Sequence, residues 1–154
     1  MKNMTHKYEI IDGRCVIPHG AEHIIHKEFE STYNLREVVI PASVTMVCSY
    51  AFSDCLSLAK IALPYSVTVI AQGAFSDCPL KSINLPKRLL NIGSGAFAGC
   101  ELESVHIPEN VLRIEEGAFS YCEKLIRPEI PAGVSIGEDA FFLPKDWDNN
   151  ELPF

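Results

Sequence analysis

The sequence lacks any apolar run long enough to cross a membrane as a helix, which takes about 20 consecutive residues. Its first residues, MKNMTHKYEIIDGR, also lack the apolar stretch of roughly 7–15 residues and the small-residue cleavage site of a secretory signal peptide. We therefore expect no membrane insertion. The chain as given is expected to remain in the cytosol.

Clustered basic charge is also scarce. The formal net charge is −7, and residues 1–100 hold nine Lys/Arg and eight Asp/Glu, whereas residues 101–154 hold four and twelve. Because the phosphates of nucleic acids bind clusters of Lys and Arg, this balance argues against nucleic acid as a partner. The acidic region either steers a basic partner over a long range or serves only to keep the protein soluble.

A combination of residues typical of catalysis is missing as well. An enzyme needs an acid, a base or a nucleophile that converge on one point, and a nucleophile needs an adjacent base. The polar residues that recur are mostly Ser, Asp and Asn, as in Ser53-Asp54 and Ser76-Asp77, and are best explained as turn formers. The sequence therefore predicts that the protein is not an enzyme.

Three histidines lie close together near the N-terminus, at His19, His23 and His26. Neutral imidazoles aimed at one point can hold a metal ion. No Cys or carboxylate lies at a convincing spacing from them, so scattered surface histidines are the alternative. We expect no metal site and no other cofactor.

What the sequence does contain is a repeat of 22–23 residues. An apolar residue followed by Pro recurs six times, and a Phe recurs six times in the same register. Two further columns hold mainly Cys and Leu. The four columns are Ile17, Ile40, Leu63, Leu85, Ile107 and Ile130 before Pro; Phe29, Phe52, Phe75, Phe97, Phe119 and Phe141; Thr32, Cys55, Cys78, Cys100 and Cys122; and Leu35, Leu58, Leu80, Leu102 and Leu125. A period of this length predicts a solenoid, in which stacked units close one shared core.

Each unit contains the patterns of three short segments. In 58–63 the apolar residues end with period two, which predicts a strand that points Ile61 and Leu63 inward and ends at Pro64. The β-branched segment 67–70 predicts a second strand. Residues 74–78 suit one helical or 3₁₀ turn that places Phe75 and Cys78 in the core. The glycine before this turn (Gly73, Gly95 or Gly117) is expected to have a positive φ or a close backbone neighbour.

The cysteine column is expected to be structural. Thiols on adjacent coils lie within disulfide distance, but their side chains point in parallel, and a line of sulfurs is not the tetrahedron that zinc prefers. Buried free cysteines pack as small apolar residues. Cys15 occupies an inward strand position like Ile17, yet Cys15 and Cys48 lie outside the column and are expected to be more exposed than it.

The unit resembles the BspA-like class of leucine-rich repeats. The match is carried by Ile40-PASVTMV followed by Tyr50-AFSDC, and by Leu63-PYSVTVI followed by Gly73-AFSDC, and it extends over about residues 14–142. The resemblance implies a right-handed leucine-rich repeat solenoid of about six repeats, built mainly from short β-strands with short helical or 3₁₀ turns. It also implies a non-catalytic module for protein–protein interaction or adhesion. Relatives are often secreted or at the cell surface, which differs from the cytosolic expectation above.

We divide the chain into an N-terminal cap or edge segment (1–13), the solenoid (14–142) and a C-terminal cap or tail (143–154). Tyr8, Ile10 and Ile11 can form an edge strand over the first coil, whose backbone groups would otherwise be unpaired. Trp147 lies among acidic and amide residues, in a segment that either folds over the last coil or remains a free peptide.

The strand residues between the inward positions line one face, which we call the ladder face. It comprises Arg14, Glu37, Lys60, Ser82, Ser104 and Arg127, together with Val16, Val39, Ala62, Asn84, His106 and Glu129. These residues vary from unit to unit while the inward ones do not, as a recognition surface requires and as any solvent face permits. Val16, Val39 and Ala62 form an apolar end suited to anchoring a partner.

The predicted partner is another protein of unknown identity, and the predicted partner-binding residues are Val39, Lys60, Ala62, Asn84, His106, Arg127 and Glu129. The alternative is a structural or self-assembly role through the ends of the solenoid. The expected oligomeric state is a monomer or weak self-association.

Overall fold

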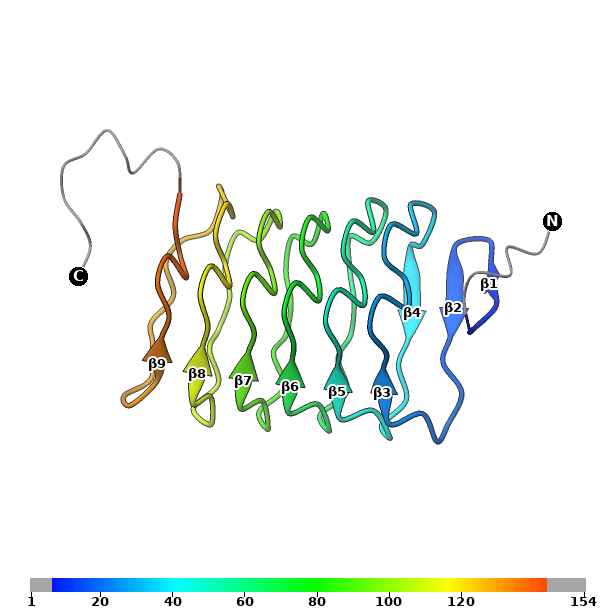
Figure 1. Cartoon of the computed structure of the whole chain (residues 1–154), viewed down its shortest axis with the longest axis horizontal. Helices are drawn as coiled ribbons and strands as arrows, with labels where there is room; N and C mark the ends of the chain where they lie inside the picture. The colour runs from blue at the N-terminus through cyan, green and yellow to red at the C-terminus, as the bar shows by residue number, and fades with distance from the viewer. Residues whose placement is uncertain (1–6, 144–154) are drawn as a thin grey trace.

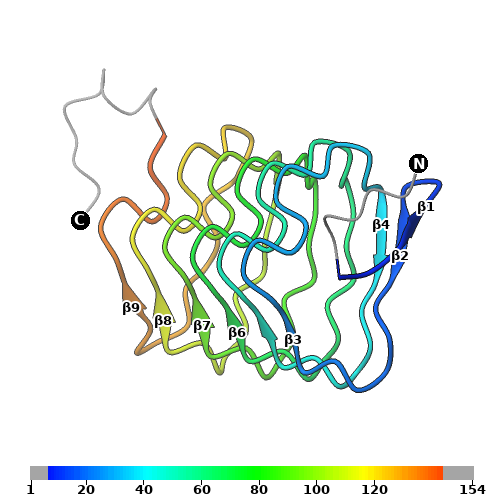
Figure 2. The same cartoon turned by 45° about the vertical axis from the view of Figure 1, so that its right-hand side comes forward.

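Stacked coils form a solenoid in the computed structural model, which describes residues 7–143 (Figure 1). The coils lie side by side along the long axis, and β1 and β9 lie at opposite ends of the stack (Figure 2). The strands of this part of the chain are all two or three residues long: β1 Ile10–Ile11, β2 Arg14–Val16, β3 His23–Ile24, β4 Glu37–Val39, β5 Met46–Val47, β6 Val69–Ile70, β7 Asn91–Ile92, β8 Arg113–Ile114 and β9 Ser135–Ile136.

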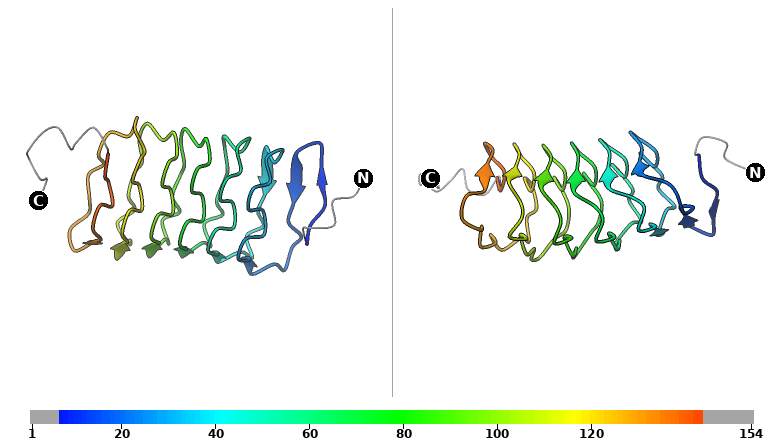
Figure 3. Two further views of the ribbon diagram at one scale, coloured as in Figure 1. Left: turned by 45° about the horizontal axis from the view of Figure 1, so that its top comes forward. Right: turned by 90° about the horizontal axis from the view of Figure 1, so that it is seen from below.

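The larger sheet runs along one side of the stack (Figure 3). Its order is β3-β5-β6-β7-β8-β9, every pair is parallel, and each pairs the same two positions of the repeat. The second residue of each strand points into the core, and it is fully buried in every strand before β9: Ile24, Val47, Ile70, Ile92 and Ile114. The predicted second strand of the unit is therefore confirmed.

The predicted first strand is formed only in part. Segment 14–16 and segment 37–39 form β2 and β4, which pair in parallel, and β1 pairs antiparallel with β2. In the following units, segments 60–63, 82–85 and 104–107 are irregular, and the prediction of a hydrogen-bonded strand there was wrong. Their alternate side chains still pack on the core. Burying these side chains does not require the backbones of adjacent coils to come within hydrogen-bonding distance on this side.

The turn around each Phe is not helical, in contrast to the prediction, and the described residues contain no helix. In the unit of Phe75, the N–H groups alternate between two kinds of acceptor. Those of Gly73, Phe75 and Asp77 donate to carbonyls of the next coil at 2.8–2.9 Å, whereas those of Ala74, Ser76 and Cys78 donate three residues back at 3.1–3.3 Å. A 3₁₀-helix needs consecutive hydrogen bonds to residue i−3. Because every second N–H donates to the neighbouring coil instead, the segment forms separate turns.

Two positions of each turn have left-handed backbone conformations. Gly73, Gly95 and Gly117 have φ near +60°, as predicted, and so do Asp54 and Asp77 two residues after a Phe. Asp tolerates this conformation better than most residues because its side chain hydrogen-bonds locally. The recurring Ser-Asp pairs therefore belong to the turn.

The core contains one continuous stack of Phe rings. Successive rings from Phe29 to Phe141 are 5.1–5.4 Å apart between centroids and lie within 9° of parallel. The ring of Tyr8 stacks on Phe29 at 6.4 Å, and the Arg127 guanidinium lies 5.4 Å from the centroid of Phe141. Side chains from outside the Phe column thus cover both ends of the stack.

The division of the chain into residues 1–13, 14–142 and 143–154 stays a prediction. The C-terminal cap or tail, including Trp147, lies outside the described residues except for Leu143.

Candidate interaction surface

The ladder face is exposed along its whole length. All seven predicted partner-binding residues are exposed: Val39, Lys60, Ala62, Asn84, His106, Arg127 and Glu129. In β2 and β4 the ladder residues pair in register, Arg14 with Glu37 and Val16 with Val39. The Arg14 Nε and Glu37 Oε1 atoms are 3.2 Å apart. The structure therefore presents these side chains to solvent in regular rows, and their role in binding a partner stays a prediction.

Arg127 differs from the other ladder residues because its guanidinium lies over the Phe141 ring. A cation over an aromatic face is attracted by the negative charge density of the ring. Replacing Arg127 would therefore disturb the end of the solenoid as well as the ladder face. An experiment on the ladder face should leave it in place.

The outer face of the larger sheet was missed by the sequence reasoning. Its outward residues are His23, Met46, Val69, Asn91, Arg113 and Ser135, and the exposed Leu90 and Leu112 adjoin it. The signal was present, because this column varies from unit to unit as the ladder face does. Both long sides of the solenoid thus combine fixed inward residues with variable outward ones.

The four column thiols are buried and free. Each Sγ donates to the carbonyl oxygen of the Phe in the preceding unit, at 2.9–3.1 Å, as Cys78 does to Phe52. Burial raises the pKa of Cys122 from its ordinary 9.0 to about 11. The pKa of Cys78 is also raised, first by a hydrogen bond with Cys55 and then by burial. A thiol that stays protonated is a poor nucleophile, and the predicted burial of the column is confirmed.

The expectation for Cys15 was wrong. Its side chain is fully buried in β2, where it occupies the same inward position as Val38 of β4. Burial, with the nearby Glu28 carboxylate as a smaller cause, raises the pKa of Cys15 to about 11. Strand alternation, rather than membership of the cysteine column, decides its exposure. Cys48 is partly exposed, as expected.

We expect Cys48 to react with a water-soluble thiol reagent much faster than the other five cysteines. The buried thiols must wait for local or global opening of the solenoid. Mass spectrometry of tryptic peptides after timed labelling at neutral pH would assign the sites. A Cys48→Ser variant should lose the fast phase. Fast labelling of all four column thiols in the native state would refute a buried column.

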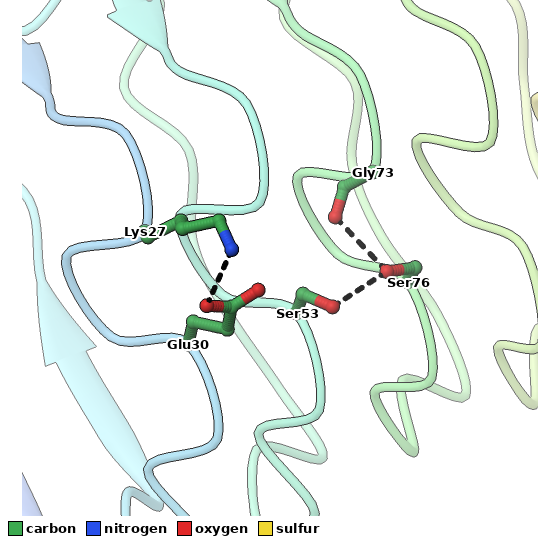
Figure 4. A network of polar contacts seen from close by, with 5 residues as sticks. All are labelled: Lys27, Glu30, Ser53, Gly73 and Ser76. Atoms are coloured by element: carbon green, nitrogen blue, oxygen red, sulfur yellow. Dashed lines mark hydrogen bonds and ion pairs between the residues drawn. The ribbon is translucent and has the colours of Figure 1, made fainter.

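A small polar network joins the turns around Phe52 and Phe75 (Figure 4). The hydroxyl of Ser76 donates to the Gly73 carbonyl oxygen at 3.1 Å, which leaves Ser53 to donate to Ser76 at 2.8 Å. The Lys27 Nζ lies 3.1 Å from a carboxylate oxygen of Glu30. Neither hydroxyl bonds to a base that could activate it as a nucleophile. The bond between Ser53 and Ser76 links two adjacent coils, whereas Lys27 and Glu30 belong to one turn.

The three N-terminal histidines do not converge. His19, His23 and His26 are exposed, and His26 lies edge-on to the Tyr50 ring at 6.2 Å. Across residues 7–143, no group of three or more His, Cys, Asp or Glu has a metal-binding arrangement.

Comparison with known proteins agrees with this architecture. Residues 22–146 match the BspA type leucine rich repeat region, in six copies. The chain belongs to the BspA-type leucine-rich repeat family. Repeats of this family typically form scaffolds for protein interaction or adhesion, and leucine-rich repeat solenoids are generally not enzymes.

Solved structures of bacterial leucine-rich repeat proteins resemble this BspA-type chain. A Bacteroides ovatus protein is 26% identical with a TM-score of 0.69, over 92% of this chain and 48% of its own. The T. pallidum leucine-rich repeat protein is also 26% identical with a TM-score of 0.69, and the match covers 89% of this chain and 85% of that protein. A Eubacterium ventriosum protein shares the fold at 23% identity and a TM-score of 0.72, over 79% of this chain and 32% of its own.

The chain thus spans about half the length of the Bacteroides ovatus protein. No curated protein matches the chain. A search of the described residues for a helix able to cross a membrane found none.

Proposed function

We propose that this BspA-type solenoid is a non-catalytic module that binds another protein through its ladder face. The observation that supports this most directly is the contrast between the two sets of strand positions. The inward positions repeat one apolar pattern and are packed on the core, whereas the outward positions vary along the solenoid and are exposed. A fixed scaffold that carries variable side chains in rows is what selective recognition of a protein surface needs.

The composition of the ladder face fits a protein partner. It combines the apolar end at Val16, Val39 and Ala62 with mixed polar groups such as Lys60, Asn84 and His106. Protein interfaces commonly combine apolar residues that anchor the partner with polar groups that add hydrogen bonds. Adhesion at a cell surface is one setting for such binding.

A triple variant with Lys60, Asn84 and His106 changed to Ala should lose a partner that the wild-type protein captures from a lysate. Truncating a few interface residues commonly removes most of the binding energy. The matched control changes Lys87, Arg88 and Glu109 to Ala, which are exposed residues outside the ladder face. Both variants lower the net charge by one, so a loss confined to the first is not a charge effect.

A partner retained by the ladder variant, or lost equally from both variants, would contradict binding through this face. Thermal unfolding of all three proteins would show that neither triple change disturbs the fold. A role in self-assembly is the second candidate, and a sedimentation coefficient that rises with concentration would favour it.

A further inference from the structure

The C-terminal end of the described solenoid exposes positions that every earlier coil buries. Ile136 of β9 is 41% exposed, whereas Ile114 at the same position of β8 is 0% exposed. Phe141 is half-buried, whereas Phe119, one coil earlier, is buried. We call 134–141 the end coil. Its apolar residues occupy the positions that one more coil would cover, and among the described residues Arg127 covers part of them at the Phe141 ring.

The end coil also has backbone N–H and carbonyl groups that lack a partner among residues 7–143. In each earlier coil, N–H groups of the Phe turn donate to the next coil, and a strand carbonyl accepts from it. For the coil of β8 these bonds are Gly117 N–H to Glu138, Phe119 N–H to Ala140, and Gly137 N–H to Ile114. The corresponding groups are the N–H of Asp139 and of Phe141 and the carbonyl of Ile136, and none has a partner within 7–143. Open strand edges of this kind pair readily with an added strand.

Acidic side chains outnumber basic ones at this end. Glu129, Glu138 and Asp139 are exposed, and the nearby Arg127 guanidinium lies over the Phe141 ring. An acidic rim around an apolar centre attracts a segment that carries Lys or Arg and disfavours an acidic one.

This charge disfavours two occupants. Residues 144–154 contain one Lys and three Asp/Glu, so they have the same sign as the rim. Two copies joined end coil to end coil would bring their acidic residues together. A head-to-tail contact would meet a first coil that is already covered, by β1 on β2 and by Tyr8 on Phe29.

We propose that the end coil binds an extended segment of another protein, which carries apolar residues at the spacing of a coil together with Lys or Arg. The segment adds to β9 and to the last Phe turn as one further coil, an instance of recognition by strand addition. This surface is separate from the ladder face.

The chain itself supplies a probe with these properties. Its segment Pro86–Gly99, PKRLLNIGSGAFAG, has the inward residues Leu89, Ile92 and Phe97, and it carries Lys87 and Arg88 with no acidic residue. A fluorescent synthetic peptide of this sequence, blocked at both ends, would be titrated with the full chain while anisotropy is recorded. We expect saturable binding that weakens as salt is added.

Two variants of the last repeat, one inside the end coil and one outside it, locate the binding. Ile136→Glu places a charge in the apolar surface, and Ile126→Glu makes the same change at a side chain that is 77% exposed. We expect Ile136→Glu to lower the affinity for the peptide about tenfold, and Ile126→Glu to change that affinity less than about twofold. In the wild-type protein, bound peptide should also slow hydrogen exchange at the amides of Asp139 and Phe141. Because it uses the wild-type protein, the exchange measurement tests the proposal even if the Ile136→Glu variant does not fold.

Four results would overturn the proposal. The first is no saturable binding up to about 1 mM peptide, and the second is an equal effect of the two Glu variants on the peptide affinity. The third is tight binding only by a chain truncated after Leu143, which would make residues 144–154 the occupant. The fourth is self-association that Ile136→Glu abolishes, which would make a second copy of the chain the occupant. The ladder-face triple variant should bind the peptide like wild type, so failure of either surface is distinguishable from failure of the other.

Discussion

Replacing Phe75 with Ala should lower the free energy of unfolding by about 3–5 kcal/mol, as expected for truncating a large buried side chain. The Phe75 ring is fully buried in the middle of the stack, 5.3 Å from Phe52 and 5.4 Å from Phe97 between centroids. Its removal leaves a cavity and breaks two ring contacts, each of which stabilises the fold beyond the area it buries. A solenoid has only nearest-neighbour contacts between coils, so a gap in one coil weakens its attachment to both neighbours.

Urea unfolding followed by circular dichroism would measure the change. The control is Tyr65→Ala, at a side chain that is 69% exposed, where the change should stay within about 0.5 kcal/mol. Equal stability of Phe75→Ala and wild type would place Phe75 outside the core and invalidate the register of the repeat.

The second large effect is expected with rising pH. Burial raises the pKa of the Cys15 and Cys122 thiols from 9.0 to about 11. Above about pH 9 the unfolded chain loses these thiol protons while the native protein keeps them, so the unfolded state gains free energy relative to the native one. Stability should therefore fall between pH 9 and pH 11, by about 2–3 kcal/mol for each of these two thiols.

Cys78 and Cys100, whose pKa values are also raised, add to this loss. Urea unfolding at pH 8, 9, 10 and 11 under a reducing agent would follow it. Because other groups titrate in the same range, the test is a comparison with Cys122→Ala, whose stability should fall by about 2–3 kcal/mol less. Identical pH profiles for the two proteins would show that Cys122 is not buried as a neutral thiol.

Most of the core followed from the repeat. A column of Phe in fixed register can be buried only if the units stack, and the structure contains that stack from Phe29 to Phe141. The glycine column marked left-handed turns, and the β-branched segment 67–70 marked the strand β6. The rows of the ladder face followed from the same alternation of inward and outward side chains.

The sequence pattern was a weaker guide to hydrogen bonding. Side-chain alternation reports which residues are inward, as it did for Ile83 and Val105, but it does not report whether neighbouring backbones meet. The strand predicted within 58–63 was accordingly not formed, and the turn at 74–78 gave every second N–H group to the next coil rather than to a helix.

By itself the sequence determined the solenoid, its register and the burial of its repeated residues, because these follow from a period that each unit shares. Tertiary structure decided what happens where the period stops. At the last coil, Arg127 lies over the final ring, and Ile136 has no following coil to bury it within the described residues. End positions carry the same residue types as interior ones, and only the stacking shows which of them lack a neighbour.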